Sequence, residues 1–72
     1  MVTHIFIKQY PIKLGQFLKR AEAVGDGLEA KLRILDGAVT VNDLVESRRG
    51  RKLYFGDVVT IDDATYICDQ KK

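Results

Sequence analysis

Four cationic side chains surround one glycine in "RRGRK", where Arg48, Arg49, Arg51 and Lys52 flank Gly50. Like charges this close repel each other, so a short domain gains no stability from them. A guanidinium group pairs with phosphate oxygens through a bidentate fork, and neutralised phosphates release condensed counterions. The cluster therefore predicts a surface that binds a polyanion. A solvated loop that keeps the chain soluble is the simpler alternative.

Two other residues carry groups that nucleic-acid contacts use. Asn42 lies in an expected turn, and shaping that turn is its main expected role. It could additionally donate to a base edge or to a ribose 2′-hydroxyl. Tyr54 follows the basic run directly. Its ring either joins the core or stacks on an unpaired base.

The sequence offers no arrangement for catalysis, metal binding or a cofactor. His4 is expected in a strand, with no Ser, Cys or carboxylate partner around it. One cysteine and one histidine can form neither an internal disulfide nor a zinc site, and Cys68 is expected to be a small buried hydrophobe. Asp62 and Asp63 suit a turn better than an acid–base pair, and no Gly-Lys-Ser/Thr phosphate loop is present. We expect no enzyme, cofactor or metal.

Length and composition indicate one small globular unit. The 72 residues suffice for one domain, which we place at 1–72, and 46% hydrophobic with 31% charged residues is typical of a soluble globular protein. The apolar runs are too short to span a membrane, and the start "MVTHIFIKQYP" lacks the features of a signal peptide. We therefore expect a cytoplasmic protein.

The charges are unevenly distributed along the chain. Residues 1–52 hold ten Lys/Arg against six Asp/Glu, a balance of +4, whereas residues 53–70 hold four Asp and no Lys/Arg, a balance of −4. Lys71 and Lys72 bring the net charge to +2. This asymmetry favours a molecule with one face directed at a polyanion.

Two helices are expected after a first strand in "THIFIKQ". From Lys13 the apolar residues follow a helical period, and Gly25 is the expected end of this helix. Its stripe consists of Leu14, Phe17, Leu18, Ala21 and Val24.

The second helix is expected to begin at Asp26. Asp26 is a suitable N-cap, and Glu29 three residues later completes a capping-box-like pair. Gly37 is the expected end. The predicted apolar stripe of this helix is Leu28, Leu32 and Leu35.

After Gly37 the pattern becomes that of β-strands. Val39 and Val41 alternate with smaller or polar neighbours, and Asn42-Asp43 is an expected tight turn. Further strands are expected at the return after this turn, at "VVTI" and at "YIC". The predicted order is β-α-α-β-β-β-β, an α+β domain with two helices packed on a small, mostly antiparallel sheet.

An ordered set of motifs resembles the ribosomal-protein S-four-type RNA-binding domain, also called the αL motif. The motifs are "KLGQFL" in the first helix, "DGLEAK" in the second, then "GAVTVND" and "GDVV", and they define a family-like core at residues 13–61. The segment "ESRRGRKLYFGD" resembles the stand-alone YaaA-like and YbcJ-like branch. The chain departs from the pattern at Asp26-Gly27, where many members have Ser-Arg, at Asp43 in place of a turn glycine, and at Arg33 in place of an apolar residue.

The resemblance implies a non-enzymatic RNA-binding protein that recognises folded RNA through phosphate contacts. The implied partner is ribosomal RNA or a ribosomal particle, such as a subunit or an assembly intermediate, and transfer RNA is the second candidate. An adaptor that docks its basic patch on an acidic protein is the alternative. The expected RNA contacts are Lys13, Lys31, Asn42, Arg48, Arg49, Arg51 and Lys52, with secondary contacts at Gln16, Lys19, Arg20, Arg33 and Tyr54.

Overall fold

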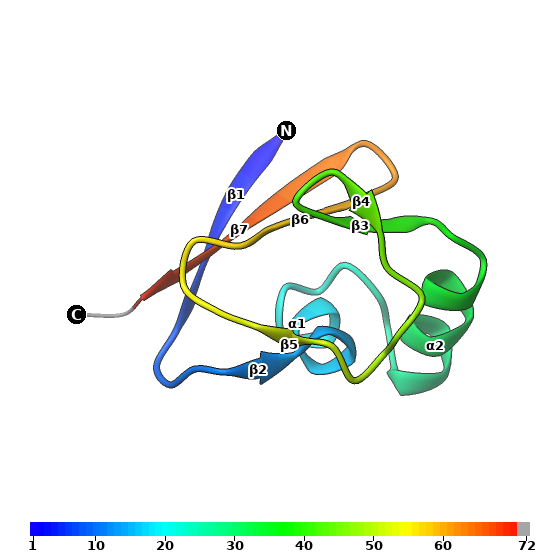
Figure 1. The fold of residues 1–72 in the computed structure, drawn as a ribbon, viewed down its shortest axis with the longest axis horizontal. Coiled ribbons are helices and arrows are strands. Elements are labelled where there is room, and N and C mark those ends of the chain that lie inside the picture. Colours follow the sequence, from blue (N-terminus) through cyan, green and yellow to red (C-terminus); the bar gives the residue numbers. More distant parts are fainter. Residues whose placement is uncertain (71–72) are drawn as a thin grey trace.

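The computed structural model describes residues 1–70, so Lys71 and Lys72 of the expected domain lie outside the described part. Figure 1 shows two helices to one side of a mixed sheet. The elements are β1 (Val2–Ile7), β2 (Ile12–Lys13), α1 (Leu14–Arg20), α2 (Gly27–Leu35), β3 (Val39–Val41), β4 (Leu44–Val45), β5 (Lys52–Leu53), β6 (Val58–Ile61) and β7 (Ala64–Gln70).

The strands form two sheets. Five strands have the order β1-β7-β6-β3-β4; β1 runs parallel to β7 and the other neighbours are antiparallel. The strands β2 and β5 pair separately as a short antiparallel ribbon. The predicted α+β class, with two helices and a mostly antiparallel sheet, is confirmed. The short strands β2 and β5 add detail that the sequence pattern did not indicate.

Helix α1 is shorter than its apolar stripe predicts. It ends at Arg20, and Glu22 then takes a left-handed conformation with φ 58°. The N–H of Ala23 donates to the Leu18 carbonyl oxygen at 2.9 Å, the long-range bond of a Schellman end. The expected end at Gly25 is therefore wrong, because a glutamate takes the position that usually favours glycine. Val24 is nevertheless buried.

Helix α2 begins and ends as predicted but buries a different face. The Asp26 carboxylate accepts the Glu29 N–H at 2.8 Å, and Gly37 ends the helix with φ 78°. Ala30 and Ile34 face the core, one turn apart. The predicted stripe is wrong, because its three leucines are all exposed. They are Leu28, Leu32 and Leu35.

Turn residues set the register of the sheet. Asn42 and Asp43 both have positive φ, 52° and 71°, and they join β3 to β4 in the tight turn that the sequence predicts. In β3, Val39 and Val41 face the core on either side of Thr40. The buried hydrophobic residues are Ile7, Leu14, Phe17, Leu18, Val24, Ala30, Ile34, Val39, Val41, Leu53, Val59, Ile61 and Cys68.

The segment 46–51 connects the five-stranded sheet to the β2–β5 ribbon (Figure 1). It is bonded to the start of α1 through its backbone. The N–H of Leu14 donates to the Arg51 carbonyl oxygen at 2.8 Å, and the N–H of Gly15 donates to the Arg49 carbonyl oxygen at 3.0 Å. These bonds satisfy two donors that a helix start leaves open. They also fix the basic run against α1.

Candidate functional site

One side of the basic run borders a cationic hollow of about 370 Å³, here called the first hollow. Lys13, Lys19 and Arg49 supply three positive charges, and no residue that lines it is acidic. Lys13 is the last residue of β2 and the N-cap of α1, Lys19 lies in α1, and Arg49 lies in segment 46–51. The lining residues are Lys13, Gly15, Gln16, Lys19, Gly27, Arg49 and Gly50.

The first hollow depends on close packing between Arg49 and Gly15. A Cβ atom added to Gly15 would lie 2.6 Å from Cγ and 3.1 Å from Cδ of Arg49. Carbon atoms in ordinary contact are roughly 3.5–4.0 Å apart, so only glycine leaves room for this arginine. Gly15 therefore lets the stem of Arg49 lie directly on α1, next to Lys13 and Gln16.

The second hollow is larger, about 600 Å³, and is also lined by Gly50. Arg48, Arg51 and Lys52 line it together with the half-exposed ring of Tyr54. Of the two roles left open for Tyr54, core packing is therefore excluded. Eight of the twelve residues expected at an RNA interface thus border one hollow or the other. They are Lys13, Gln16, Lys19, Arg48, Arg49, Arg51, Lys52 and Tyr54.

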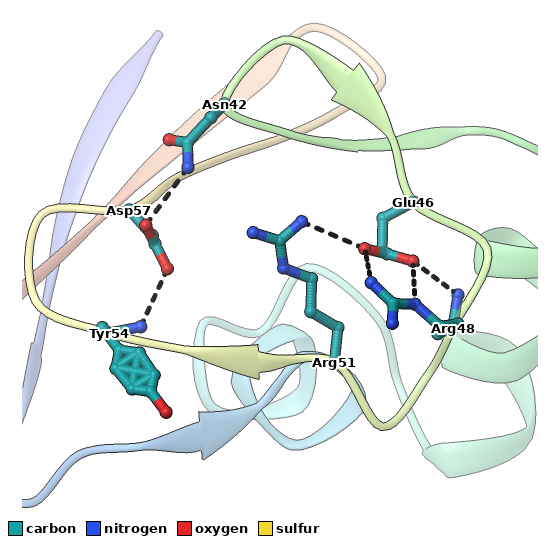
Figure 2. Close-up of polar contacts among 6 residues, drawn as sticks. All are labelled: Asn42, Glu46, Arg48, Arg51, Tyr54 and Asp57. Carbon is teal, nitrogen blue, oxygen red and sulfur yellow. Dashed lines mark hydrogen bonds and ion pairs between the residues drawn. The ribbon is translucent and has the colours of Figure 1, made fainter.

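A buried acid holds two of these arginines (Figure 2). The Glu46 side chain is only 8% exposed. Its carboxylate accepts the Arg48 backbone N–H at 3.0 Å, Arg48 Nε and Nη2 at 3.0 and 3.2 Å, and Arg51 Nη1 at 3.0 Å. The side-chain hydrogen bond from Arg48 is the largest cause that lowers the Glu46 pKa from 4.5 to about 2, against an opposing effect of burial. Glu46 is therefore ionised at neutral pH.

Glu46 is a residue of the site that the sequence pattern did not predict. The available signal was an acid close to four cations: in "ESRRGRK", Glu46 comes two residues before Arg48. The contacts also change the expected role of the arginines. Arg48 and Arg51 neutralise a buried charge, so they contribute to the fold as well as to the basic surface. Among the described residues, the side-chain hydrogen bonds and ion pairs of Glu46 go to Arg48 and Arg51 and not to Arg49.

Four residues that the sequence predicted as RNA contacts lie outside both hollows. Lys31 is exposed on α2, and Arg20 is exposed at the end of α1. Arg33 pairs with Asp62 in the β6–β7 turn. The fourth residue is Asn42.

Asn42 ties the β3–β4 turn to the chain before β6. Its Nδ2 donates to Asp57 Oδ1 at 3.1 Å, and its Oδ1 accepts the Val58 N–H at 3.0 Å. Asp57 in turn accepts the Tyr54 N–H at 2.8 Å through Oδ2 (Figure 2). The turn-shaping role expected for Asn42 is therefore present in the structure.

Two glycines leave the hollows open. Gly50 lines both of them, and a Cβ atom added there would meet nothing within 4 Å. Its φ is not among the positive values, so the backbone does not require a glycine at this position. A Cβ at Gly27 would lie 4.0 Å from the Lys19 ammonium nitrogen. The ammonium of Lys19 thus lies beside the position where the family pattern often has an arginine.

Two other groups that could carry chemistry, His4 and Cys68, lie on the paired strands β1 and β7. His4 Nδ1 lies 2.9 Å from Asp69 Oδ2, so the expectation that His4 has no carboxylate partner is wrong. Parallel pairing of β1 with β7 brings these residues together. Burial raises the pKa of Cys68 to about 12, which leaves an unreactive thiol. The described residues contain no cluster of three or more metal-ligating side chains, and none of their helices could cross a membrane.

Comparison with known proteins shows the family of this chain. Residues 5–68 match the S4 domain family. The chain therefore belongs to that family, the class of RNA-binding domains that its motifs resemble. It is 48% identical over 62 residues to the probable ribosome maturation protein RlbA of Bacillus subtilis (strain 168). The alignment covers 86% of this chain and 87% of that relative.

Proposed function

We propose that this protein is a non-enzymatic, cytoplasmic RNA-binding protein that recognises folded RNA of the ribosome or of a ribosomal particle during its maturation. Residues 1–72 act as one RNA-binding domain. Membership of the S4 domain family supports RNA binding, and the printed name of the Bacillus relative supports a role connected with ribosome maturation. Transfer RNA remains the second candidate ligand.

The observation that carries this proposal is the pair of cationic hollows that share Gly50. Together they gather six cations from β2, α1, the segment 46–51 and β5, and the second hollow adds the exposed ring of Tyr54. Cations spread over four segments suit the regularly spaced phosphates of an RNA backbone better than a compact acidic motif. The cations are Lys13, Lys19, Arg48, Arg49, Arg51 and Lys52.

Gly50 also supports the binding of an RNA backbone at the two hollows. The fold does not require glycine at this position, because a Cβ atom would project into open space. Glycine is typical where a backbone must closely approach a ligand. A phosphate that passes from one hollow to the other would run directly over Gly50.

The test is a salt series of fluorescence-anisotropy titrations on ribosomal RNA fragments, transfer RNA and duplex DNA. If four to six phosphates are neutralised, log K falls with log[salt] at a slope of roughly −3 to −5. We expect tight binding to one folded ribosomal RNA and weaker binding to duplex DNA. Weak and equal binding to all three ligands would refute the proposal and favour the acidic-partner adaptor.

A matched pair of variants locates the interface. Arg49→Gln removes a cation from the first hollow, while Lys8→Gln removes the same charge from an exposed residue that borders neither hollow. We expect Arg49→Gln to weaken binding and to reduce the salt slope by about 1. Lys8→Gln should change the affinity much less. Equal losses in the two variants would show that only net charge matters.

A further inference from the structure

Glu46 is unexpected in a surface that attracts a polyanion. Removing an acid from such a surface normally strengthens binding, because it raises the local positive potential. Yet Glu46 is buried directly beneath the basic run and accepts hydrogen bonds from two of its arginines. We therefore asked how Glu46 could favour polyanion binding although its negative charge opposes it.

The contacts of Glu46 leave the outer edges of both guanidinium groups available. Arg48 uses two of its five N–H donors on Glu46, through Nε and Nη2, and three remain. Arg51 uses one of five, through Nη1, and four remain. The Arg48 side chain is 75% exposed although its partner is buried, so its unused donors reach solvent at the second hollow.

A long arginine side chain on a surface samples many rotamers, and binding must then immobilise it at an entropic cost. Glu46 removes part of this cost in the folded protein, because it fixes two guanidinium groups before the ligand arrives. The N–H of Glu46 itself donates to the Val39 carbonyl oxygen at 3.1 Å, which anchors this residue to β3 in the main sheet. The orientation of both arginines is thus tied to the core.

We propose that Glu46 is a positioning residue for RNA binding: it holds Arg48 and Arg51 so that their free edges take RNA phosphate oxygens at the second hollow. The proposal rests on the proposed function and goes beyond it, because it assigns a favourable role in polyanion binding to an acid. Glu46 touches no ligand itself. It acts through the two arginines.

The first experiment compares Glu46→Gln with Asp43→Asn, by anisotropy on the RNA that the wild-type protein binds best. Each substitution removes one negative charge and keeps the side-chain shape, but Asp43 is exposed in the β3–β4 turn and borders neither hollow. We expect Glu46→Gln to bind roughly five- to tenfold more weakly, because two side chains lose their fixed orientation. Asp43→Asn should bind equally or slightly more tightly.

A double-mutant cycle separates positioning from a general effect on the fold. Arg48→Gln is measured in the wild-type and in the Glu46→Gln background, below the unfolding transition of every variant. If Glu46 acts through Arg48, Arg48→Gln costs several-fold in affinity in the wild type and little in the Glu46→Gln background. The milder Glu46→Asp variant, whose shorter side chain cannot reach both arginines equally, provides the same cycle should Glu46→Gln fail to fold.

Two results would overturn the inference. One is a folded Glu46→Gln protein that binds as tightly as the wild type or more tightly. The other is an equal cost of Arg48→Gln in both backgrounds, since the two residues would then act independently. Absence of RNA binding by the wild-type protein would instead refute the proposed function, so the two failures are distinguishable.

Discussion

Replacement of Gly15 by alanine tests the packing that shapes the first hollow. Alanine is favoured over glycine in a helix by roughly 0.5–1 kcal/mol, so Gly15→Ala alone would stabilise an unobstructed α1. Here the new Cβ would lie 2.6 Å from Arg49 Cγ, about 1 Å inside normal contact. Cγ lies close to the backbone, so Arg49 must leave its rotamer, at a cost of about 0.5–1.5 kcal/mol. We therefore expect little net change or a loss of stability.

The same substitution should become stabilising once the arginine stem is removed. In the Arg49→Ala background the clash is absent, while the backbone bond from Gly15 N–H to the residue-49 carbonyl remains. Gly15→Ala should then raise the free energy of unfolding by up to about 1 kcal/mol, a Tm increase of roughly 4–8 °C for a domain of this size.

The assay is urea denaturation of the four proteins in the cycle, together with RNA titration. Gly15→Ala should weaken RNA binding in the wild type by displacing Arg49, and should have little effect on binding once Arg49 is alanine. A stability gain of the same size in both backgrounds, to within about 0.3 kcal/mol, would refute the proposed contact between residues 15 and 49.

Two further predictions follow from the residues around the hollows. The pKa of Glu46 is lowered from 4.5 to about 2, so the ionised carboxylate stabilises the fold above about pH 4.5. This stabilisation is lost as the pH falls toward 2. Unfolding measurements between about pH 5 and pH 2 should show that Glu46→Gln lacks this part of the acid sensitivity. Gly50→Ala should leave the free energy of unfolding unchanged or raise it by up to about 1 kcal/mol, because the new Cβ meets nothing within 4 Å. The same substitution should weaken RNA binding. Unchanged affinity would argue against passage of the ligand over Gly50.

Local signals in the sequence predicted the elements whose causes are local. Asp26 caps α2, and the Asn42-Asp43 turn sets the β3–β4 hairpin, since each depends on neighbouring backbone groups. The end of α1 was missed because Glu22 takes the left-handed conformation for which glycine is the usual signal. The buried face of α2 was missed because apolar residues occupy two sides of that helix, and only tertiary packing selects Ala30 and Ile34.

The candidate site, too, was predictable from the sequence only where its causes are local. Residue types predicted a cationic surface, but its shape depends on contacts between distant segments. The β2–β5 ribbon pairs Lys13 with Lys52, 39 positions apart, and thereby brings the start of α1 beside the basic run. No periodicity in either segment indicates that pairing. The separation of the cations into two hollows is likewise a product of the tertiary fold.

Substitutions of the arginines report on different properties in the two hollows. In the second hollow, Arg48 and Arg51 balance a buried carboxylate, so replacing either one leaves Glu46 with fewer partners and mixes a loss of stability with a loss of binding. In the first hollow, Arg49 rests on Gly15 and its removal exposes no buried charge. A triple charge reversal across the basic run would therefore report chiefly on unfolding. Substitution of Arg49 therefore tests RNA binding without disturbing the fold. The effects of substituting Arg48 or Arg51 on binding can be interpreted only by comparison with variants of Glu46.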